Sequence, residues 1–315
     1  MHPKQLQFAF APSPGPMSKP FLKWAGGKGQ LLSQIGQHLP PGLWEGSLTK
    51  YAEPFIGGGA VFFQIANSFD VNEFFISDMN EDLVLAYRTI SQQVELLIDR
   101  LQAIERLYQL LDVDGRREFF YETRALFNRR ATLASGTAPD EEAGHVARLI
   151  FLNRTCFNGL YRVNSSGEFN VPHGNYRNPR ICDAANLRSV SRSLRNTEIR
   201  FGDFTACRDF VDENTFVYLD PPYRPISKTA NFNSFYRSPF GDEEQKRLAH
   251  FYQELGNVGA KLMLSNSDPH NENPEDSFFE DLYADFSIHK VYASRKINSN
   301  GAKRGPITEL LIANY

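Results

Sequence analysis

Long apolar runs, paired cysteines and a secretion signal are all missing from this chain of 315 residues. No stretch approaches the roughly 18 consecutive apolar residues that a membrane-spanning helix needs. Cys156, Cys182 and Cys207 show no repeated short spacing, which argues against a disulfide framework or a zinc site and is typical of a reducing cytoplasm. Residues 1–19 contain no apolar core flanked by charge, so we expect a disordered N-terminal extension there and not a signal peptide.

An overall basic charge is missing too, since the net charge is −3. The charge is nevertheless unevenly distributed: between Arg148 and Arg200 there are nine arginines, three acids and no lysine, a local net charge of about +6. Salt screens distant acids, so a local basic stripe is able to bind phosphates. The guanidinium fork suits phosphate and base edges alike. Solvated helix faces are the alternative explanation of this stripe.

The hydrophobic pattern predicts an α/β fold in which a helical segment interrupts a sheet. We expect strands at residues 50–55, 73–77, 199–201, 215–219 and 261–264, and a terminal hairpin that pairs residues 288–293 with 309–314. Helices are expected at residues 60–66, 82–106, 117–129, 145–153 and 242–255, with a loop over 131–142. We interpret residues 86–186 as an inserted second domain, and residues 20–85 with 187–315 as the domain that bears the sheet.

Asp220-Pro221-Pro222-Tyr223 follows the apolar run of residues 215–219, which is typical of a buried parallel strand. Ligands of α/β sheets bind beyond the carboxyl ends of the strands. Pro221 and Pro222 have no N–H groups and cannot continue the hydrogen bonds of a β-sheet. They therefore hold the Asp220 carboxylate beside backbone carbonyls that lack a hydrogen-bond donor. Such acceptors suit a planar substrate with an NH2 group, on which the Tyr ring stacks. A simple helix-entry turn is the alternative.

A glycine-rich turn at residues 57–59 lies between a predicted strand and a predicted helix. Glycines let a ligand approach the backbone closely, and a helix N-terminus offers free N–H groups. Asp78 follows about 20 residues later, where an acid is able to hold ribose hydroxyls. Phe62 breaks the Gly-x-Gly-x-x-Gly pattern, which disfavours NAD, and Lys28 is followed by Gly29, which excludes a P-loop. Another adenosine-bearing cofactor is favoured, although a tight structural turn would explain the glycines alone.

Four further motifs lie in the same chain, at residues 21–28, 153–164, 167–174 and 229–232. The second contains Asn153-Arg154-Thr155-Cys156-Phe157-Asn158-Gly159-Leu160, and Asn164-Ser165-Ser166-Gly167 predicts a hairpin turn. With the glycine turn and Asp-Pro-Pro-Tyr, they resemble the Dam-type DNA adenine methyltransferases. The resemblance covers residues 20–315 and implies a Rossmann-like, S-adenosylmethionine-dependent methyltransferase sheet. It also implies an inserted, mainly helical DNA-recognition domain that carries a β-hairpin.

The resemblance implies an enzyme that methylates the N6 amine of adenine in double-stranded DNA, typically within GATC, by base flipping and direct transfer. It implies S-adenosylmethionine as cofactor, no metal, no membrane, and a bacterial cytoplasmic or nucleoid location. We also expect a monomer. The implied catalytic residues are Asp220, Pro221, Pro222 and Tyr223. The implied cofactor site comprises Trp24, Ala25, Gly26, Lys28, Phe55, Gly57, Gly59, Asp78, Asp203, Phe204 and Asp220. The implied DNA contacts are Lys23, Arg154, Phe157, Asn158, Leu160, Arg162, Asn164, Pro172, Tyr176, Asn231, Arg295 and Asn300.

Several alternatives stay open at this point. The acceptor could be RNA or a protein amide, since Asp/Asn-Pro-Pro-Tyr motifs occur in such enzymes too. A catalytically idle DNA-binding module and a nicotinamide-dependent oxidoreductase fit less well. Arg154 could brace the inserted domain through a buried carboxylate instead of contacting phosphate. Phe157 replaces a Tyr of the family, and His173 stands where the family often has an aromatic residue.

Overall fold

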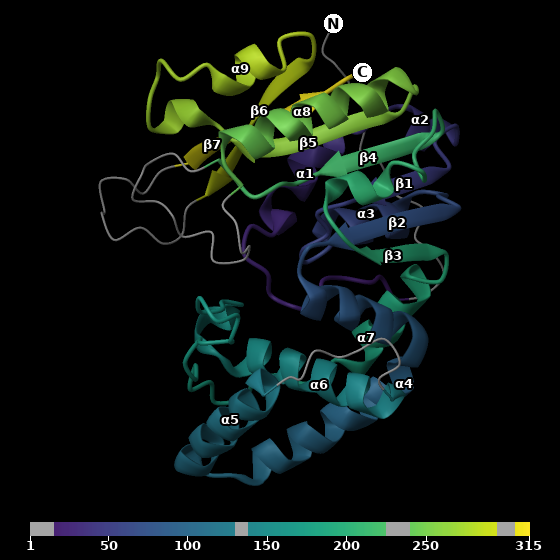
Figure 1. Ribbon diagram of the computed structural model, residues 1–315. Helices are drawn as coiled ribbons and strands as arrows, with labels where there is room; N and C mark the ends of the chain where they lie inside the picture. The colour runs from purple at the N-terminus through teal and green to yellow at the C-terminus, as the bar shows by residue number, and fades with distance from the viewer. Residues whose placement is uncertain (1–15, 130–137, 225–239, 295–305) are drawn as a thin grey trace, which may run out of the picture.

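The computed structural model describes residues 16–129, 138–224, 240–294 and 306–315 (Figure 1). Within them, seven strands form one sheet in the order β3-β2-β1-β4-β5-β7-β6. The strands are β1 (Lys50–Glu53), β2 (Glu73–Asp78), β3 (Thr197–Phe201), β4 (Thr215–Leu219), β5 (Lys261–Ser267), β6 (Ser287–Ser294) and β7 (Pro306–Ala313). Strands β1 to β5 are parallel, while β7 is antiparallel to both β5 and β6. The predicted terminal hairpin is therefore confirmed.

Both faces of the central strands are buried, which explains their unbroken apolar sequences. In β4, Phe216 and Tyr218 belong to one hydrophobic cluster, and Val217 and Leu219 belong to another. Successive side chains of a strand point to opposite faces, so a strand covered on both faces is apolar throughout. Each such buried side chain stabilises the fold by about 1.5–3 kcal/mol relative to its exposed state.

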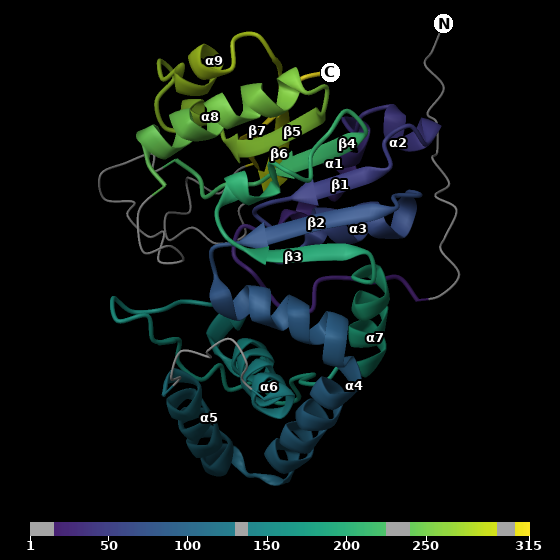
Figure 2. The same ribbon diagram turned by 45° about the vertical axis from the view of Figure 1, so that its right-hand side comes forward.

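Helices cover the two faces of the sheet (Figures 1 and 2). One face packs against α1 (Leu32–Gln37), α2 (Gly42–Glu45), α3 (Ala60–Ser68), the first half of α4 (Glu81–Leu110) and α7 (Ala184–Ser193). The other face packs against α8 (Asp242–Asn257) and α9 (Phe278–Leu282). Short 3-10 turns lie at Lys28–Gln30, Phe157–Gly159, Phe204–Cys207 and Pro269–Asn271.

The inserted segment hangs from the β3 edge of the sheet, below it in Figures 1 and 2. It contains the second half of α4, α5 (Val113–Asn128) and α6 (Pro139–Thr155). Helix α4 runs through both parts, with non-helical torsion angles only at Gln93 (φ −140°, ψ 36°). Before Gln93, the Tyr87 hydroxyl donates to the Gly57 carbonyl at 3.1 Å. The expected domain boundary at residue 86 therefore falls inside a helix, and the buried side chains of both parts form one cluster.

Two helix starts differ from the sequence-based expectation. Helix α5 begins at Val113 and not at residue 117, because the Asp112 side chain accepts the Gly115 N–H at 2.9 Å and caps it. Helix α6 begins at Pro139, inside the loop expected over residues 131–142. Pro at the first position and three acids in the first turn both favour a helix start. Residues 130–137 lie outside the described part.

The N-terminal extension joins the fold earlier than expected. The Ser18 side chain is buried, and its hydroxyl contacts Asn67 at 3.1 Å and Ser193 at 2.8 Å. The Lys19 N–H donates to Asn186 at 3.1 Å. These contacts tie residues 18 and 19 to α3 and α7, which contradicts disorder at these two positions. Residues 1–15 lie outside the described part, so disorder there stays a prediction.

The predicted hairpin turn is confirmed, although its ladder is short. The Asn164 N–H donates to the Glu168 carbonyl at 2.9 Å, and the Gly167 N–H donates to the Asn164 carbonyl at 2.9 Å. Val163 and Phe169 form an isolated antiparallel bridge. Gly167 has φ +80°, a conformation that favours glycine.

Candidate active site

Asp220 follows β4 directly, at the carboxyl end of the central strand. Its Oδ1 atom lies 2.7 Å from the Lys28 ammonium and accepts the Ser265 hydroxyl at 2.9 Å. Ser265 in turn accepts a hydrogen bond from the Tyr218 hydroxyl at 3.0 Å. Within the described residues, Oδ2 of Asp220 has no such partner. Two donors thus fix one oxygen of this carboxylate and leave the other available to a ligand.

Lys28 is almost completely buried, with 5% of its side chain exposed. Besides Asp220, its ammonium contacts the Gly26 carbonyl at 3.1 Å and lies 4.0 Å from the Glu309 carboxylate. It also sits 4.7 Å from the centre of the Tyr223 ring, within cation–π range. A buried ammonium requires such compensation because its desolvation is costly.

The Asp-Pro-Pro-Tyr segment is held by side chains from α8 and β7. The Tyr223 hydroxyl donates to the Glu309 carboxylate of β7. Gln245 of α8 donates from Nε2 to the Pro222 carbonyl at 3.1 Å. The Pro221 carbonyl receives no hydrogen bond from the described residues, so it remains an acceptor next to Asp220. The contacts of Tyr223 with Glu309 and of Gln245 with Pro222 favour a binding site here over a simple helix-entry turn.

The glycine turn after β1 forms a second half of the site. Gly57 and Gly59 have φ values of +45° and +70°. The Gly57 N–H donates to Oδ2 of Asp78 at 3.1 Å, and the Asn80 N–H donates to Oδ1 at 2.9 Å. Burial outweighs these hydrogen bonds and raises the pKa of Asp78 to about 6.

The segment before Lys28 packs against the glycine turn through the Trp24 side chain. A Cβ atom at Gly57 would lie 3.1 Å from the Trp24 ring, and one at Gly58 would lie 3.2 Å from the Trp24 side chain. Trp24 also stacks on Tyr161, with ring centres 5.0 Å apart and an angle of 25°. Residues distant in sequence thus meet at this turn.

These two halves line one cavity of about 250 Å³. Its lining contains every predicted catalytic residue and nine predicted cofactor residues: Asp220, Pro221, Pro222, Tyr223, Trp24, Ala25, Gly26, Lys28, Phe55, Gly57, Gly59 and Asp78. Asp203 and Phe204 do not line it. Asp203 accepts the Thr205 N–H at 3.0 Å, and the Phe204 ring packs behind Phe55 at 5.7 Å.

Glu53, Tyr218, Ser265 and Glu309 belong to the site but were not predicted. Glu53 lines the cavity and accepts the Tyr51 hydroxyl at 2.6 Å. Complete burial raises the pKa of Glu53 well above its usual value. Glu53 lies next to the glycine motif and could have been suspected. Ser265 and Glu309 lie on β5 and β7, where no local sequence signal points to Asp220 or Tyr223.

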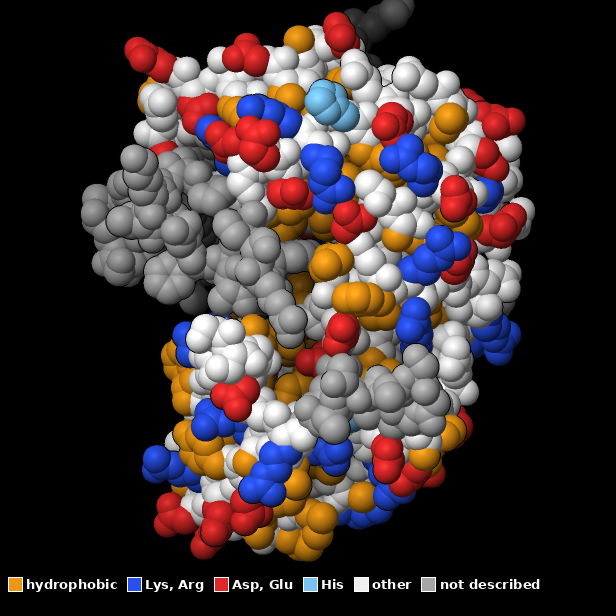
Figure 3. Space-filling model, in the orientation of Figure 1, with side chains coloured by type: hydrophobic (Ala, Val, Ile, Leu, Met, Phe, Trp, Pro, Cys, Tyr) orange, Lys and Arg blue, Asp and Glu red, His pale blue; other side chains and the backbone are white. Residues whose placement is uncertain are grey.

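Five predicted DNA-contact residues cluster on the surface beside this cavity. The Phe157 N–H donates to the Pro172 carbonyl at 2.8 Å, and the Asn158 N–H donates to the Tyr176 hydroxyl at 2.9 Å. The Lys23 ammonium lies 5.7 Å from the Tyr176 ring centre. The Phe157 side chain is 52% exposed although its backbone is fixed. Figure 3 shows that this face of the molecule is hollowed between the sheet and the helices below it.

Other predicted DNA contacts are less free. The Asn164 side chain is hydrogen-bonded within the hairpin turn, where its Oδ1 atom accepts the N–H groups of Ser166 and Glu168. Arg162 is exposed and donates to Asn170 at 2.7 Å, and Leu160 is 40% exposed. Arg154 donates to the Phe21 carbonyl at 2.7 Å, so it braces this part of the chain through a backbone carbonyl and not through the expected carboxylate.

The basic stripe is partly neutralised by ion pairs. Three of its arginines contact acids: Arg180 with Asp183 at 2.8 Å, Arg188 with Glu95 at 2.6 Å, and Arg200 with Glu198 at 2.5 Å. For these three, solvated ion pairs are the better explanation. Asn231, Arg295 and Asn300 lie outside the described residues.

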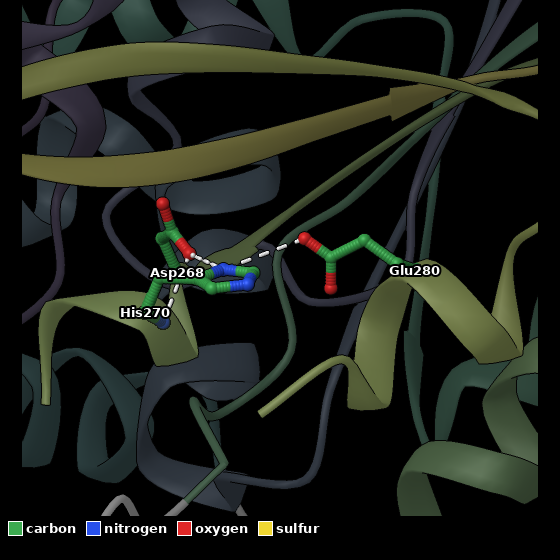
Figure 4. A group of neighbouring side chains, drawn as sticks. All are labelled: Asp268, His270 and Glu280. Carbon is green, nitrogen blue, oxygen red and sulfur yellow. Dashed lines mark hydrogen bonds and ion pairs between the residues drawn. The ribbon is translucent and has the colours of Figure 1, made fainter. Parts of the chain in front are cut away.

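Asp268, His270 and Glu280 form a group with metal-ligand chemistry (Figure 4). Oδ1 of Asp268 accepts the His270 N–H at 3.1 Å and contacts Nδ1 of its ring at 2.8 Å. Oδ2 accepts the Thr308 hydroxyl at 2.7 Å and contacts the Lys290 ammonium at 3.0 Å. Burial alone would raise the pKa of Asp268, but these hydrogen bonds outweigh it and hold that pKa below its usual value. Lys290 already supplies a cation, so we assign this group a structural role.

Comparison with known proteins agrees with this geometry. Residues 24–297 match the family described as D12 class N6 adenine-specific DNA methyltransferase. The chain belongs to this family. It is 49% identical over 298 residues to the Type II methyltransferase M.MjaIII of Methanocaldococcus jannaschii, covering 94% of this chain and 99% of the relative. It is 38% identical to the Type II methyltransferase M1.LlaDCHI of Lactococcus lactis subsp. cremoris, covering 94% and 95%. It is 31% identical to the DNA adenine methylase of Escherichia coli K12, covering 93% and 94%.

Membership confirms the resemblance, the enzyme class and the Rossmann-like methyltransferase sheet. It also implies S-adenosylmethionine as the methyl donor and DNA as the substrate. The cavity fits such a donor, because a carboxylate (Asp78), two aromatic side chains (Trp24 and Phe55) and the glycine turn all line it. All three cysteines of this methyltransferase are free. Every helix within the described residues is too short or too polar to cross a bilayer.

The glycine turn yields a stability prediction for this methyltransferase. A Cβ atom at Gly59 would lie 2.6 Å from the Tyr87 hydroxyl, in a backbone conformation that disfavours L-residues. We expect Gly59→Ala to lower the free energy of unfolding by about 1–3 kcal/mol, measured by urea titration. Gly29→Ala is the control, because its Cβ would meet nothing within 4 Å. Equal effects of both variants would contradict the assigned strain.

Proposed function

We propose that this methyltransferase transfers the methyl group of S-adenosylmethionine to the N6 amine of a flipped adenine in double-stranded DNA, within GATC. The observation that carries the proposal is the available Oδ2 atom of Asp220, in a cavity shared with the glycine turn. The Pro221 carbonyl adds a second acceptor. A carboxylate and a carbonyl at one end of a cavity suit the two hydrogens of an aromatic amine.

The geometry supports a role for each residue of the catalytic end. Asp220 and the Pro221 carbonyl accept the amine hydrogens, which aligns the nitrogen lone pair. Lys28 and Ser265 hold the Oδ1 atom of the carboxylate in place, at 2.7 Å and 2.9 Å, and so orient Oδ2. Glu309 orients the Tyr223 ring, on which the adenine stacks.

The chain's residues also account for the donor end of the cavity. S-adenosylmethionine supplies an electrophilic methyl group on sulfonium, so no nucleophilic side chain is required. Asp78 would accept the ribose hydroxyls, and Trp24 and Phe55 would cover the donor's apolar surface. Gly57 and Gly59 line the same cavity without side chains, so the donor would lie against backbone there.

The recognition surface supports duplex DNA as the substrate. Phe157 is an exposed ring on a fixed backbone, which suits insertion into a duplex from which a base has been extruded. The Tyr176 hydroxyl contacts the next residue, Asn158, the Lys23 ammonium lies near the Tyr176 ring, and Arg162 is exposed further along the same segment. We assign GATC from the Dam-type resemblance, and we extend the proposal to a monomer acting in the bacterial cytoplasm or nucleoid.

The function is tested by tritium transfer from labelled S-adenosylmethionine to two duplexes, one with GATC and one with GGTC in its place. We expect label only in the first. Equal label in both duplexes would support methyl transfer to DNA but would contradict GATC as the recognition sequence. Label in neither duplex, with donor binding confirmed, would refute the proposed DNA acceptor, and RNA and protein acceptors would then be assayed in the same way.

Asp220→Asn should abolish most of the turnover, because a neutral amide places an NH2 group where an acceptor is needed. We expect kcat to fall by at least about 100-fold, or about 2.7 kcal/mol in activation free energy. The Kd for the duplex, measured by fluorescence anisotropy, should change less than about threefold, because Asp220 lies in the cavity and not on the surface. Asp209→Asn is the exposed control. Near-normal turnover of Asp220→Asn would remove Asp220 from the mechanism.

Donor affinity should depend on pH through Asp78. Its pKa of about 6 means that it is ionised at pH 7.5 and mostly protonated at pH 5. A carboxylate accepts hydrogen bonds more strongly than a carboxylic acid. Calorimetry with S-adenosylhomocysteine should therefore show affinity falling by about tenfold between pH 7 and pH 5.

The Asp78→Asn variant should bind S-adenosylhomocysteine more weakly than the unmodified protein at pH 7.5, and its affinity should not change between pH 7 and pH 5. Exposed Asp70 provides the matched control, and Asp70→Asn should retain the slope. A slope that persists in Asp78→Asn would assign the titration to another group, for which buried Glu53 is the candidate.

A further inference from the structure

The segment of residues 21–24 lies between the DNA-facing surface and the donor cavity. Lys23 is exposed beside Tyr176, whereas its neighbour Trp24 lines the cavity. Phe21 and Leu22 are buried and anchor the segment. Adjacent residues of one short segment thus face the two ligands of the proposed reaction.

Helix α6 clamps this segment through its backbone. The Lys23 N–H donates to Oδ1 of Asn153 at 2.9 Å, and Nδ2 of Asn153 donates to the Lys23 carbonyl at 2.9 Å. The same Nδ2 atom donates to the Gly159 carbonyl at 3.1 Å, next to Asn158 and Leu160. Asn153 is 1% exposed. One buried amide therefore fixes Lys23 relative to the predicted base-reading segment.

Tyr161 makes the corresponding contact on the cavity side. It lies between Leu160 and Arg162 in sequence, yet its own side chain is only 4% exposed. Its ring stacks on Trp24 with 5.0 Å between ring centres. Any movement of the base-reading segment that displaces Tyr161 must also displace one wall of the donor cavity.

Asp82 connects Tyr161 to the donor's proposed ribose site. The Tyr161 hydroxyl donates to Oδ2 of Asp82 at 3.0 Å, and Nε2 of His145 contacts Oδ1 of Asp82 at 2.9 Å. Asp82 lies in the first turn of α4, four residues after Asp78. The Asn80 side chain caps that turn by accepting the Leu83 N–H at 3.0 Å. A short, rigid connection thus runs from the hairpin to Asp78.

We propose that Tyr161 is a positioning residue that couples DNA binding to donor binding, through its stack on Trp24 and its hydrogen bond to Asp82. This rests on the proposed function. A shift of residues 157–162 when DNA binds moves Tyr161 and, through the stack and the hydrogen bond, Trp24 and Asp82, so the donor cavity responds to DNA. By linkage, donor binding strengthens DNA binding by the same factor. Simple core packing would instead affect stability without coupling the two ligands.

The test measures the Kd of S-adenosylhomocysteine by calorimetry, with and without a saturating duplex that accepts methyl groups in the transfer assay. The ratio of these two Kd values is the coupling factor. The product is used because it cannot methylate the duplex during the measurement. We expect a ratio of at least about fivefold for the unmodified protein. Tyr161→Phe should lower this ratio toward one, while its Kd without DNA stays within about twofold, because the Trp24 stack is retained.

Tyr108→Phe is the matched control. Tyr108 is 1% exposed in the same inserted segment, and its hydroxyl contacts Nε2 of His173 at 2.9 Å, outside the donor cavity lining. Both variants lose one buried hydroxyl, so both should lose similar stability in thermal unfolding. Only Tyr161→Phe should lose coupling. An equal loss in both variants would assign the effect to general destabilisation and overturn the proposal.

Asp82→Asn tests the same Tyr161–Asp82 hydrogen bond by changing its acceptor. This variant keeps the proposal testable if Tyr161→Phe folds poorly. It should also lower the coupling factor, and the double variant should lose no more than either single variant. A coupling factor of one in the unmodified protein, or an unchanged factor in Tyr161→Phe, would overturn the inference. Absence of duplex binding or methyl transfer by the unmodified protein would instead be a failure of the proposed function.

Discussion

The contact between the Lys28 ammonium and Asp220, buried and 2.7 Å long, is the interaction on which the site depends. It joins the segment before the first strand to the end of the fourth strand, and so closes the cavity between them. Burying the ammonium beside this partly buried carboxylate is tolerable because Ser265 and the Gly26 carbonyl add hydrogen bonds to the pair. Glu309 adds a second carboxylate 4.0 Å from the same ammonium. Removing Lys28 would leave the Asp220 carboxylate without its ammonium partner where the proposed reaction takes place.

Sheet topology explains why these groups meet. The chain proceeds from β1 outward to β2 and β3 on one side, and later to β4 and β5 on the other. A ligand cavity at such a change of direction is the general rule for open α/β sheets. Here the glycine turn follows β1 and Asp220 follows β4, so the donor end and the acceptor end open into one space. The antiparallel β7 then brings Glu309 to Tyr223, a contribution that the parallel strands alone could not make.

The inserted segment is more closely integrated with the sheet than an independent recognition module would be. Helix α4 runs through both parts, and their buried side chains form one cluster. Arg154, a predicted phosphate contact, donates to the Phe21 carbonyl, and the Asn153 side chain accepts the Lys23 N–H. Polar side chains near the junction thus fix the two parts relative to each other. Phe157, in contrast, keeps an exposed ring.

The sequence by itself determined the strands, the sheet edge that carries the site and most of the cavity lining, because apolar periodicity and glycine and proline placement are local properties. It also determined the family, through motifs whose order survives along the chain. Only the tertiary structure decided the partners of those motifs: Ser265 and Glu309 are distant in sequence from Asp220 and Tyr223, and nothing near them signals the contact. It also decided that Phe204 packs behind Phe55 and does not line the cavity. Contacts across a sheet depend on strand order and register, which residue types along one strand do not encode.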